Sequence, residues 1–204
     1  MTLGQRFARV TTDVVVRVPG AWRLFRGRMA AQFDSLAPEW DRTRVSPERL
    51  VALRAALEAF PDPPARVLDL GTGTGAAART AAALWPDAEV VGVDVSRGMI
   101  AEARRLAPSE RVRYEVGDSS ALPFETASFD AVILNNMIPF FDEVARVVKP
   151  GGHAAIAYSM GERTPIYVPL ARLRAELGKR GFADFREFST GPGLSLLAHR
   201  AEAS

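Results

Sequence analysis

The sequence has no cysteine and only two histidines among its 204 residues. The absence of cysteine excludes a disulfide framework, thiol catalysis and cysteine-bound metals, and it fits a reducing compartment. His153 and His199 lie far apart in the sequence, each inside a stretch that predicts a strand, without a cluster of acids nearby. We therefore interpret both as structural residues and expect no metal site.

Long apolar runs are also missing. The first apolar run, Val14–Val18, is short and is interrupted by Arg17. The pattern predicts neither a secretory signal nor a spanning helix, which needs roughly 18 apolar residues. The hydrophobic content of 48% and the charged content of 25% are typical of a globular protein. We expect a cytoplasmic protein, and a net charge of +2 gives no argument for nucleic-acid binding.

The stretch at residues 65–75 predicts a strand that ends in a glycine-rich turn. Residues 66–70 form a short apolar run around Asp69, glycine alternates with threonine at 71–75, and Ala76–Leu84 predicts a helix. Glycines permit positive φ and let backbone N–H groups approach a ligand closely. Asp69, at the carboxyl end of the strand, faces the place where open α/β sheets bind ligands. The segment therefore predicts a nucleotide-binding corner.

Two interpretations of this corner compete. A dinucleotide fingerprint can be placed on Gly71, Gly73 and Ala76, with Asp94 about 20 residues further on as the ribose acid. However, Asp69 would be a poor neighbour for a pyrophosphate and a good one for a cation. The stretch resembles motif I of the class I S-adenosylmethionine (SAM)-dependent methyltransferases, in which an acid precedes Gly-x-Gly-x-Gly. SAM carries an ammonium and a sulfonium, which suit that acid.

Downstream residues favour the SAM interpretation. Asp94 and Asp118 each follow a further predicted strand, at 89–93 and 111–116. The stretch from Gly117 to Asp130, Gly-Asp-x-x-x-Leu-Pro-Phe-x-x-x-Ser-Phe-Asp, closely resembles a signature of methyltransferases related to quinone-biosynthesis enzymes. A dehydrogenase has no reason to carry this signature.

The resemblance covers about residues 33–200 and implies an α/β fold. We expect a Rossmann-like, seven-stranded, mostly parallel sheet with helices on both faces and a C-terminal antiparallel strand, preceded by an N-terminal helical lid. We place the lid at residues 1–45 and the SAM-binding methyltransferase domain at residues 46–204. The later expected elements are strands at 130–135 and 153–159, a helix and turn at 144–152, a helix at 168–180, and a hairpin of strands at 182–189 and 194–199.

The resemblance also implies the residues that hold SAM. Around its methionine moiety we place Asp69, Gly71, Thr72, Gly73 and Gly75; at the ribose Asp94 and Val95; and at the adenine Met99, Asp118 and Ser119. Asn135 is placed at the mouth where the methyl group is transferred. The stretch from Phe33 to Asp41 resembles the family's helical lid, which makes Trp40 the candidate for closing the pocket.

The first 36 residues predict two amphipathic helices separated by Pro19-Gly20. The predicted apolar stripes are Leu3, Phe7, Val10 and Val14, and then Trp22, Phe25, Met29, Phe33 and Leu36. Residues 1–30 carry six arginines and one acid, Asp13, a local charge of about five positive units. One interpretation is helices packed on the domain with solvated arginines. The other is a mobile lid or an interfacial helix that meets a lipophilic or anionic acceptor, with peripheral membrane contact through residues 1–30.

The sequence predicts a SAM-dependent methyltransferase that acts on a small, apolar or aromatic molecule. Methyl transfer depends mainly on positioning, and no side chain stands out as a general base.

We expect acceptor contacts from Asn136, Glu162, Arg163 and Tyr167. The segment after Asn135 lacks the Asn/Asp-Pro-Pro-aromatic pattern of enzymes that methylate amines of nucleic acids, which disfavours such an acceptor. The shortness of this segment predicts an open pocket.

Two alternatives stay open at this level. One is a SAM-binding protein without turnover, whose basic N-terminal helices dock a partner or a membrane. The other is a different reaction of the same fold, such as aminopropyl transfer, although the sequence offers no extra acids for a polyamine pocket.

Overall fold

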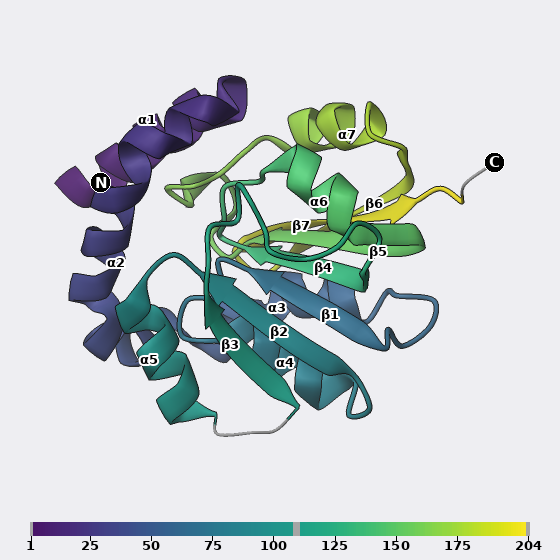
Figure 1. Cartoon of the computed structure of the whole chain (residues 1–204), viewed down its shortest axis with the longest axis horizontal. Helices are drawn as coiled ribbons and strands as arrows, with labels where there is room; N and C mark the ends of the chain where they lie inside the picture. The colour runs from purple at the N-terminus through teal and green to yellow at the C-terminus, as the bar shows by residue number, and fades with distance from the viewer. Residues whose placement is uncertain (1, 108–110, 203–204) are drawn as a thin grey trace.

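The structure, a computed structural model, describes residues 2–107 and 111–202. Seven strands form one sheet in the order β3-β2-β1-β4-β5-β7-β6 (Figure 1). The first five strands of the chain pair in parallel, and β7 runs antiparallel to both β5 and β6. This confirms the predicted Rossmann-like sheet with its antiparallel C-terminal strand. The strands are β1 Arg66–Leu70, β2 Glu89–Asp94, β3 Val112–Val116, β4 Phe129–Asn135, β5 Val148–Tyr158, β6 Phe182–Thr190 and β7 Gly193–Arg200.

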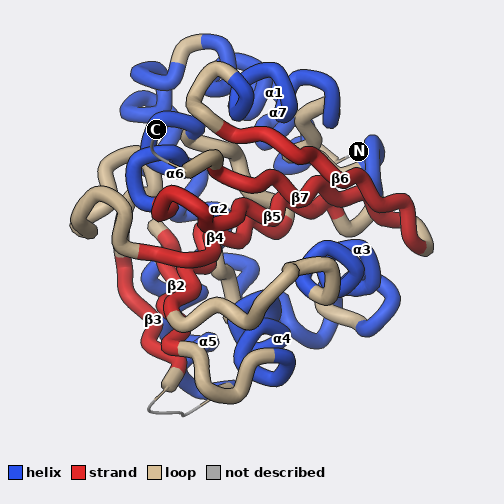
Figure 2. Tube along the Cα trace, turned by 90° about the vertical axis from the view of Figure 1, so that its right-hand side faces the viewer, coloured by secondary structure: helices blue, strands red, loops and turns tan. Residues whose placement is uncertain are grey.

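Helices cover both faces of this sheet (Figure 2). The helices α3, α4 and α5 pack on one face, while α6 and α7 pack on the other. The helices are α1 Leu3–Arg17, α2 Trp22–Arg44, α3 Pro47–Leu57, α4 Ala76–Leu84, α5 Arg97–Leu106, α6 Phe141–Val147 and α7 Leu170–Gly178, with short 3-10 turns η1 Pro19–Ala21 and η2 Gly161–Arg163. None of the described helices is both long and apolar enough to cross a bilayer.

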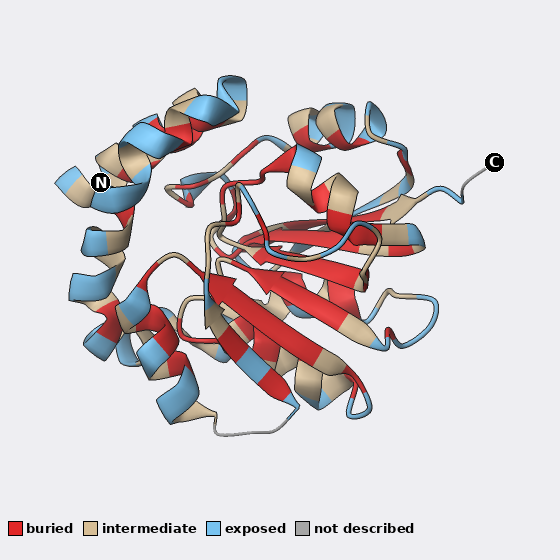
Figure 3. Cartoon of the chain, viewed as in Figure 1, coloured by how far each residue is buried: buried red, intermediate tan, exposed pale blue. Residues whose placement is uncertain are grey.

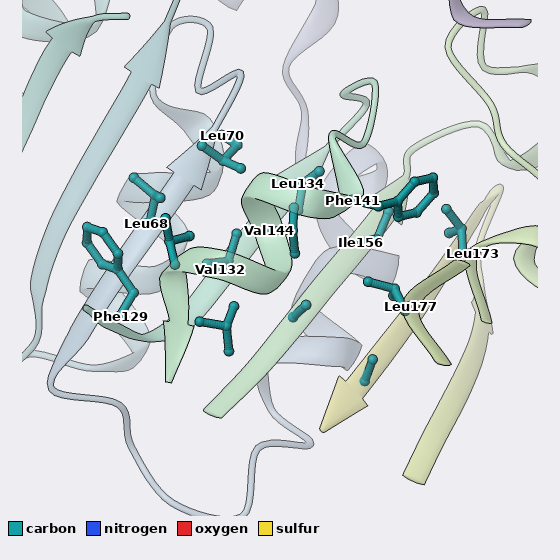
Figure 4. Packing of buried hydrophobic residues seen from close by; sticks show 14 of the residues in the cluster. Leu68, Leu70, Phe129, Val132, Leu134, Phe141, Val144, Ile156, Leu173 and Leu177 are labelled. Carbon is teal, nitrogen blue, oxygen red and sulfur yellow. The ribbon is translucent and has the colours of Figure 1, made fainter. Parts of the chain in front are cut away.

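The central strands are buried on both faces, which explains their nearly continuous apolar sequences (Figure 3). Successive side chains of a strand point to opposite faces of the sheet and therefore pack in different cores. Leu68 and Leu70 lie in the core beneath α6 and α7, and Val67 lies in the core against α3 and α4 (Figure 4). Full burial of one such side chain stabilises the fold by about 1.5–3 kcal/mol. The sheet is therefore a rigid base for the loops at the carboxyl ends of its strands.

The first two helices form a helical hairpin, residues 3–44, that lies beyond the carboxyl ends of β1, β2 and β3 (Figure 1). Phe7 of α1 packs edge-on against Phe25 of α2, with ring centroids 6.2 Å apart. The stripe predicted for α2 lies on its inner side, where Trp22 and Met29 are buried.

The stripe predicted for α1 was wrong for two of its four residues, since only Phe7 and Val14 are partly buried. Leu3 and Val10 are exposed, and the buried residues of α1 are Ala8, Thr11, Thr12 and Val15. The hydroxyl of Thr12 donates to the carbonyl oxygen of Ala8 over 2.8 Å, so burial of this hydroxyl is compensated. Small side chains let α1 approach its neighbours closely, which the apolar periodicity did not reveal.

A second correction concerns the expected turn at residues 149–152, which lies within β5 as a bulge. Val148 pairs with Phe129 and His153 pairs with Ala131, so four residues of β5 face the single residue Asp130. Gly151 adopts φ +77° there. Lys149 donates to Asp130 over 2.6 Å and holds the bulge to β4. The preceding helix α6 has only seven residues.

Candidate functional site

A cavity of about 750 Å³ lies at the carboxyl ends of the parallel strands, beneath the helical hairpin. Twelve of the sequence-predicted site residues line it: Trp40, Asp69, Gly71, Thr72, Gly73, Asp94, Val95, Met99, Ser119, Asn135, Asn136 and Arg163. Four others, Gly75, Asp118, Glu162 and Tyr167, are not part of its lining. The cavity therefore gathers residues from loops that are up to about a hundred positions apart in the chain.

The glycine-rich turn forms the floor of the cavity, and its three glycines have different surroundings. All three adopt positive φ: +64° at Gly71, +55° at Gly73 and +84° at Gly75. A Cβ at Gly71 would collide with the side chain of Met137, whereas a Cβ at Gly73 would meet nothing within 4 Å. Gly75 is buried under Tyr114 and caps α4, which is why it does not reach the cavity. At Gly73 the backbone is therefore exposed to the cavity without a side chain in between.

Asp69 is fully buried beneath this turn. Its Oδ2 accepts hydrogen bonds from the Thr72 hydroxyl (2.6 Å) and the Ala78 amide (3.0 Å). Its Oδ1 has no hydrogen-bond partner among the described residues. Burial raises the pKa of Asp69 to about 7, against the opposing effect of those two hydrogen bonds. An unpaired carboxylate oxygen at this depth is a strong attractor for a cation.

Asp94 ends β2 and ties two loops together. Its Oδ2 accepts from the amide of Gly73 (2.9 Å), and its Oδ1 accepts from the amide of Ser96 (2.8 Å). Burial raises the pKa of Asp94, and these backbone hydrogen bonds act in the opposite direction. Each carboxylate oxygen accepts one protein hydrogen bond and keeps acceptor capacity for another, as paired hydroxyls of a ribose would require.

Asp118 is held from above by the helical hairpin. The indole Nε1 of Trp22 donates to its Oδ1 over 2.8 Å, and Arg26 donates to its Oδ2 over 3.1 Å. Burial alone would raise the pKa of Asp118, but hydrogen bonds from Ser120, Trp22 and Arg26 keep it below its ordinary value. The carboxylate is therefore engaged by α2, while the neighbouring Ser119 lines the cavity.

Two further acids on α2 attach the hairpin to the sheet. Asp34 Oδ1 accepts from the Ser96 hydroxyl (2.6 Å) and the Gly98 amide (2.8 Å) at the start of α5. Asp41 Oδ1 accepts from the Thr74 hydroxyl (2.8 Å) and from Arg79 (2.9 Å). Sequence analysis did not assign these contacts. The repeat of aromatic-Asp at 33–34 and 40–41 was their signal, because a spacing of seven places both acids on one face of a helix.

Aromatic residues of the same repeat close the cavity. Phe33 and Trp40 line it and pack edge-on, with ring centroids 5.5 Å apart. The guanidinium of Arg44 lies 5.4 Å from the Trp40 ring centroid. Trp40, which the sequence predicted to close the pocket, therefore lies in the cavity lining.

The opposite end of the cavity is built by the loops after β4 and β5. Asn135 Oδ1 is buried without a partner among the described residues. Asn136, at φ +55°, accepts from the Ser159 amide (2.8 Å) and donates to the Ser159 hydroxyl (3.1 Å), so it links the two loops. Met137, Ile138, Met160 and Ile166 add apolar surface. These four side chains belong to the two loops from which acceptor contacts were expected, although none of the four was singled out, because apolar residues in a loop have no periodicity to mark them.

Arg9 of α1 was also missed, and it organises the second of these loops. Its guanidinium donates to the carbonyl oxygens of Glu162 (3.0 Å), Thr164 (2.8 Å) and Tyr167 (3.2 Å). Glu162 and Tyr167 thus hold α1 through their backbone carbonyl oxygens. Their side chains, predicted as acceptor contacts, lie outside the cavity lining.

The lining is poor in groups that transfer protons. Its ionisable residues are Asp69, Asp94, Arg44, Arg49 and Arg163. Each acid accepts a hydrogen bond from a backbone amide, and a guanidinium has no acceptor atom to offer. Within the described part of the chain, no three His, Asp, Glu or Cys residues are grouped to hold a metal. The cavity is therefore suited to binding and orienting molecules rather than to general-base chemistry.

Comparisons with known proteins agree with this geometry. A family model described as a methyltransferase domain matches residues 67–152. A demethylmenaquinone methyltransferase of Clavibacter sepedonicus is 35% identical over 169 residues, which cover 77% of this chain and 66% of that protein. A malonyl-acyl-carrier-protein O-methyltransferase of Methylococcus capsulatus is 33% identical over 148 residues, which cover 68% of this chain and 52% of that protein. The chain thus spans between 52% and 66% of the length of these curated relatives.

The fold also occurs in a solved structure with a different printed activity. The crystal structure of the cyclase SpnF superposes with a TM-score of 0.69 at 19% sequence identity, covering 86% of this chain and 96% of that chain. At this identity the likeness concerns the fold alone.

Proposed function

Since the chain belongs to the class I SAM-dependent methyltransferases, we propose that it transfers the methyl group of SAM to a small, apolar or aromatic molecule. The observation that carries the proposal is the pair of buried oxygens, Asp69 Oδ1 and Asn135 Oδ1, that have no partner among the described residues. Both residues line the same cavity. Two acceptors without donors suit a ligand with a positively charged, hydrogen-bonding end.

The other cavity residues suit the rest of SAM. The bare backbone at Gly73 leaves room beside Asp69 for the methionine moiety. Asp94 keeps acceptor capacity for the two ribose hydroxyls. Met99, Val95 and Ser119 offer a mostly apolar place for the adenine. Asp118 fits the adenine less well than expected, because Trp22 and Arg26 already occupy its carboxylate.

SAM supplies an activated methyl group with a good leaving group, so the protein needs no nucleophile of its own. The chain's contribution is to hold the two reactants and to exclude water. Positioning alone is worth roughly 7–11 kcal/mol in the best intramolecular models. Phe33 and Trp40 of α2 and Gln5 and Ala8 of α1 line the cavity. Arg9 attaches α1 to the loop at 162–167.

The acceptor is proposed from the lining at the Asn135 end. Met137, Ile138, Met160 and Ile166 offer apolar surface, and Arg163 adds one cationic group at the rim. An aromatic molecule with one ionised oxygen suits this combination, and it would arrive without needing a general base. Because two relatives are named as a demethylmenaquinone and a malonyl-acyl-carrier-protein methyltransferase, the acceptor panel starts with reduced naphthoquinones and continues with acyl compounds that carry a free carboxylate.

A second candidate function is SAM binding without methyl transfer. It is favoured because the two carboxylates of the lining, Asp69 and Asp94, are both assigned to SAM, and because this fold also occurs in a cyclase. The two functions differ in one readout, because only methyl transfer converts SAM to S-adenosylhomocysteine in the presence of an acceptor.

The test starts with calorimetric titration of the protein with SAM, S-adenosylhomocysteine and NAD. We expect micromolar binding of both sulfur ligands and none of NAD. The variant Asp94→Asn should bind at least tenfold more weakly, and Asp87→Asn, which changes an exposed acid outside the cavity, should bind as the parent does. Failure of both sulfur ligands to bind would overturn the proposal.

Turnover is then measured with SAM and the acceptor panel. Methylated product with any acceptor of the panel supports the first function. Binding of SAM without product on every acceptor supports the second.

A further inference from the structure

Exposed apolar side chains gather on the helical hairpin. Five large apolar residues of the described chain are exposed, and four of them lie between residues 3 and 24: Leu3 (84%), Val10 (57%), Val18 (59%) and Leu24 (82%). Single exposed apolar residues are ordinary on a protein surface, but four within so short a segment set the hairpin apart from the rest of the described surface.

Two of these residues lie on the outer side of α1, and the other two lie beside the turn that joins α1 to α2. Leu3 and Val10 are seven residues apart, so they lie on one face of α1, opposite the buried residues Ala8, Thr11 and Val15. Val18 and Leu24 flank the short turn η1 that joins the two helices. The hairpin is largely exposed on its outer side (Figure 3).

The net charge around this face is positive, because the arginines outnumber its one exposed acid, Asp13. Of the six arginines in residues 1–30, Arg9 binds carbonyl oxygens, Arg26 pairs with Asp118 and Arg28 lies over Phe7. Each of the other three, Arg6, Arg17 and Arg23, is exposed and has no acidic partner among the described residues. Arg6 and Arg17 follow the same helical face as Leu3 and Val10.

We propose that this outer face, composed of Leu3, Val10, Val18, Leu24 and the three free arginines, docks on an anionic lipid bilayer. Aliphatic side chains beside arginines match the boundary between acyl chains and charged headgroups. A nucleic acid would use the arginines but would give the exposed leucines no role.

Docking on a bilayer would also bring a lipophilic methyl acceptor close to the cavity. This extension rests on the proposed function. Gln5 and Ala8 of α1 and Met29 of α2 line the cavity from beneath the same hairpin. A lipophilic acceptor dissolved in the bilayer would therefore reach the cavity along the helices that touch the membrane.

The experiment is flotation of the full chain with vesicles of phosphatidylcholine alone and of phosphatidylcholine mixed with phosphatidylglycerol. We expect binding to the mixed vesicles that weakens with salt, and little binding to the neutral ones. The variant Arg6→Gln/Arg17→Gln/Arg23→Gln should bind about a hundredfold more weakly, at about fivefold for each charge. The variant Leu3→Ser/Leu24→Ser should also lose most of its binding.

Matched controls separate the outer face from net charge. Arg54→Gln/Arg97→Gln/Arg105→Gln removes the same charge from exposed positions elsewhere, and Val116→Ser removes the fifth exposed apolar residue. Both controls should bind vesicles as the parent does. All changed side chains are exposed, and thermal unfolding confirms that each variant is folded.

Three outcomes would overturn the proposal: no flotation with either vesicle, equal losses in the outer-face and control variants, or binding to duplex DNA as tight as to vesicles and indifferent to Leu3→Ser/Leu24→Ser. SAM titration on the same samples is independent of this result. A chain that binds SAM but not vesicles would disprove docking alone, and the reverse would disprove only the proposed function.

Discussion

The indole Nε1 of Trp22 donates a hydrogen bond to Asp118 Oδ1 over 2.8 Å, and this contact joins α2 to the loop after β3. Further along α2, Asp34 joins it to the loop after β2, and Asp41 joins it to the turn after β1. One helix is thus fastened to three successive strand ends by polar contacts. We propose that these contacts, which can exchange with water, let the hairpin act as a cover that opens for ligands to enter and leave.

Substitution Trp22→Phe should loosen this cover. It removes the hydrogen bond to Asp118 and keeps an aromatic ring against Phe140, whose centroid lies 5.5 Å away. We expect a loss of about 0.5–1.5 kcal/mol in the free energy of unfolding. Dissociation of SAM, followed by stopped-flow fluorescence, should be several-fold faster. Trp85→Phe, a change within the main core, should leave that dissociation rate unchanged.

The pKa of Asp69, raised to about 7 by burial, predicts a pH dependence of SAM binding. A bound ammonium favours the carboxylate, so affinity should increase as pH rises from 6 to 8, and binding should release a proton near pH 6.5. Calorimetry in two buffers of different ionisation enthalpy measures this proton. In Asp69→Asn, binding should be weaker and independent of pH over this range; a pH dependence that survives the substitution would assign it to another group.

The same pKa predicts a pH dependence of stability. The folded-state pKa of about 7 lies above the unfolded value of 3.8, so between these values the folded state binds the extra proton. Asp69's contribution is therefore fully present below pH 3.8 and is lost as pH rises through 7, by at most about 4 kcal/mol. Asp69→Asn should be more stable than the parent at pH 8, and the advantage should shrink at pH 5. Urea unfolding at both pH values checks this sign.

Substitution of Gly73 tests whether a ligand lies against the backbone that faces the cavity. An alanine there must adopt φ +55°, which costs about 1–2 kcal/mol, but its methyl group meets no protein atom within 4 Å. Gly181, at φ +84° and equally free of neighbours, lies outside the cavity lining. Gly73→Ala and Gly181→Ala should lose similar stability, while only Gly73→Ala should lose SAM affinity, by tenfold or more. Equal affinities in the two variants would mean that no ligand lies against Gly73.

Arg9 should affect the acceptor more than SAM. Arg9→Met keeps the apolar part of the side chain and removes three hydrogen bonds to the carbonyl oxygens of the loop at 162–167. We expect about 1 kcal/mol less stability, because these carbonyl oxygens are partly accessible to water. The KM for a methyl acceptor should rise several-fold, while the SAM dissociation constant stays constant. Arg6→Met, on the same helix without such contacts, is the control; a matching rise in its KM would contradict the role of Arg9.

The sequence by itself determined where the strands lie, that the central strands are buried, and which polar residues stand near their carboxyl ends. Apolar runs of five to seven residues that end in Asp69, Asp94 or Asn135 leave few alternatives to a buried parallel sheet. The glycine turn could be predicted because positive φ restricts the residue types that tolerate it. These features are local, and local patterns are what a sequence displays directly.

Only the tertiary structure decided which side chains face the cavity and which face another part of the chain. Asp118 is engaged by Trp22, 96 positions away, and Gly75 packs against Tyr114. Three of the four buried residues of α1, Ala8, Thr11 and Thr12, are alanine or threonine rather than members of the apolar stripe that periodicity suggests. Arg9 binds carbonyl oxygens more than 150 positions away. Such pairings depend on where the helical hairpin docks, and no spacing within a single segment of the sequence encodes that position.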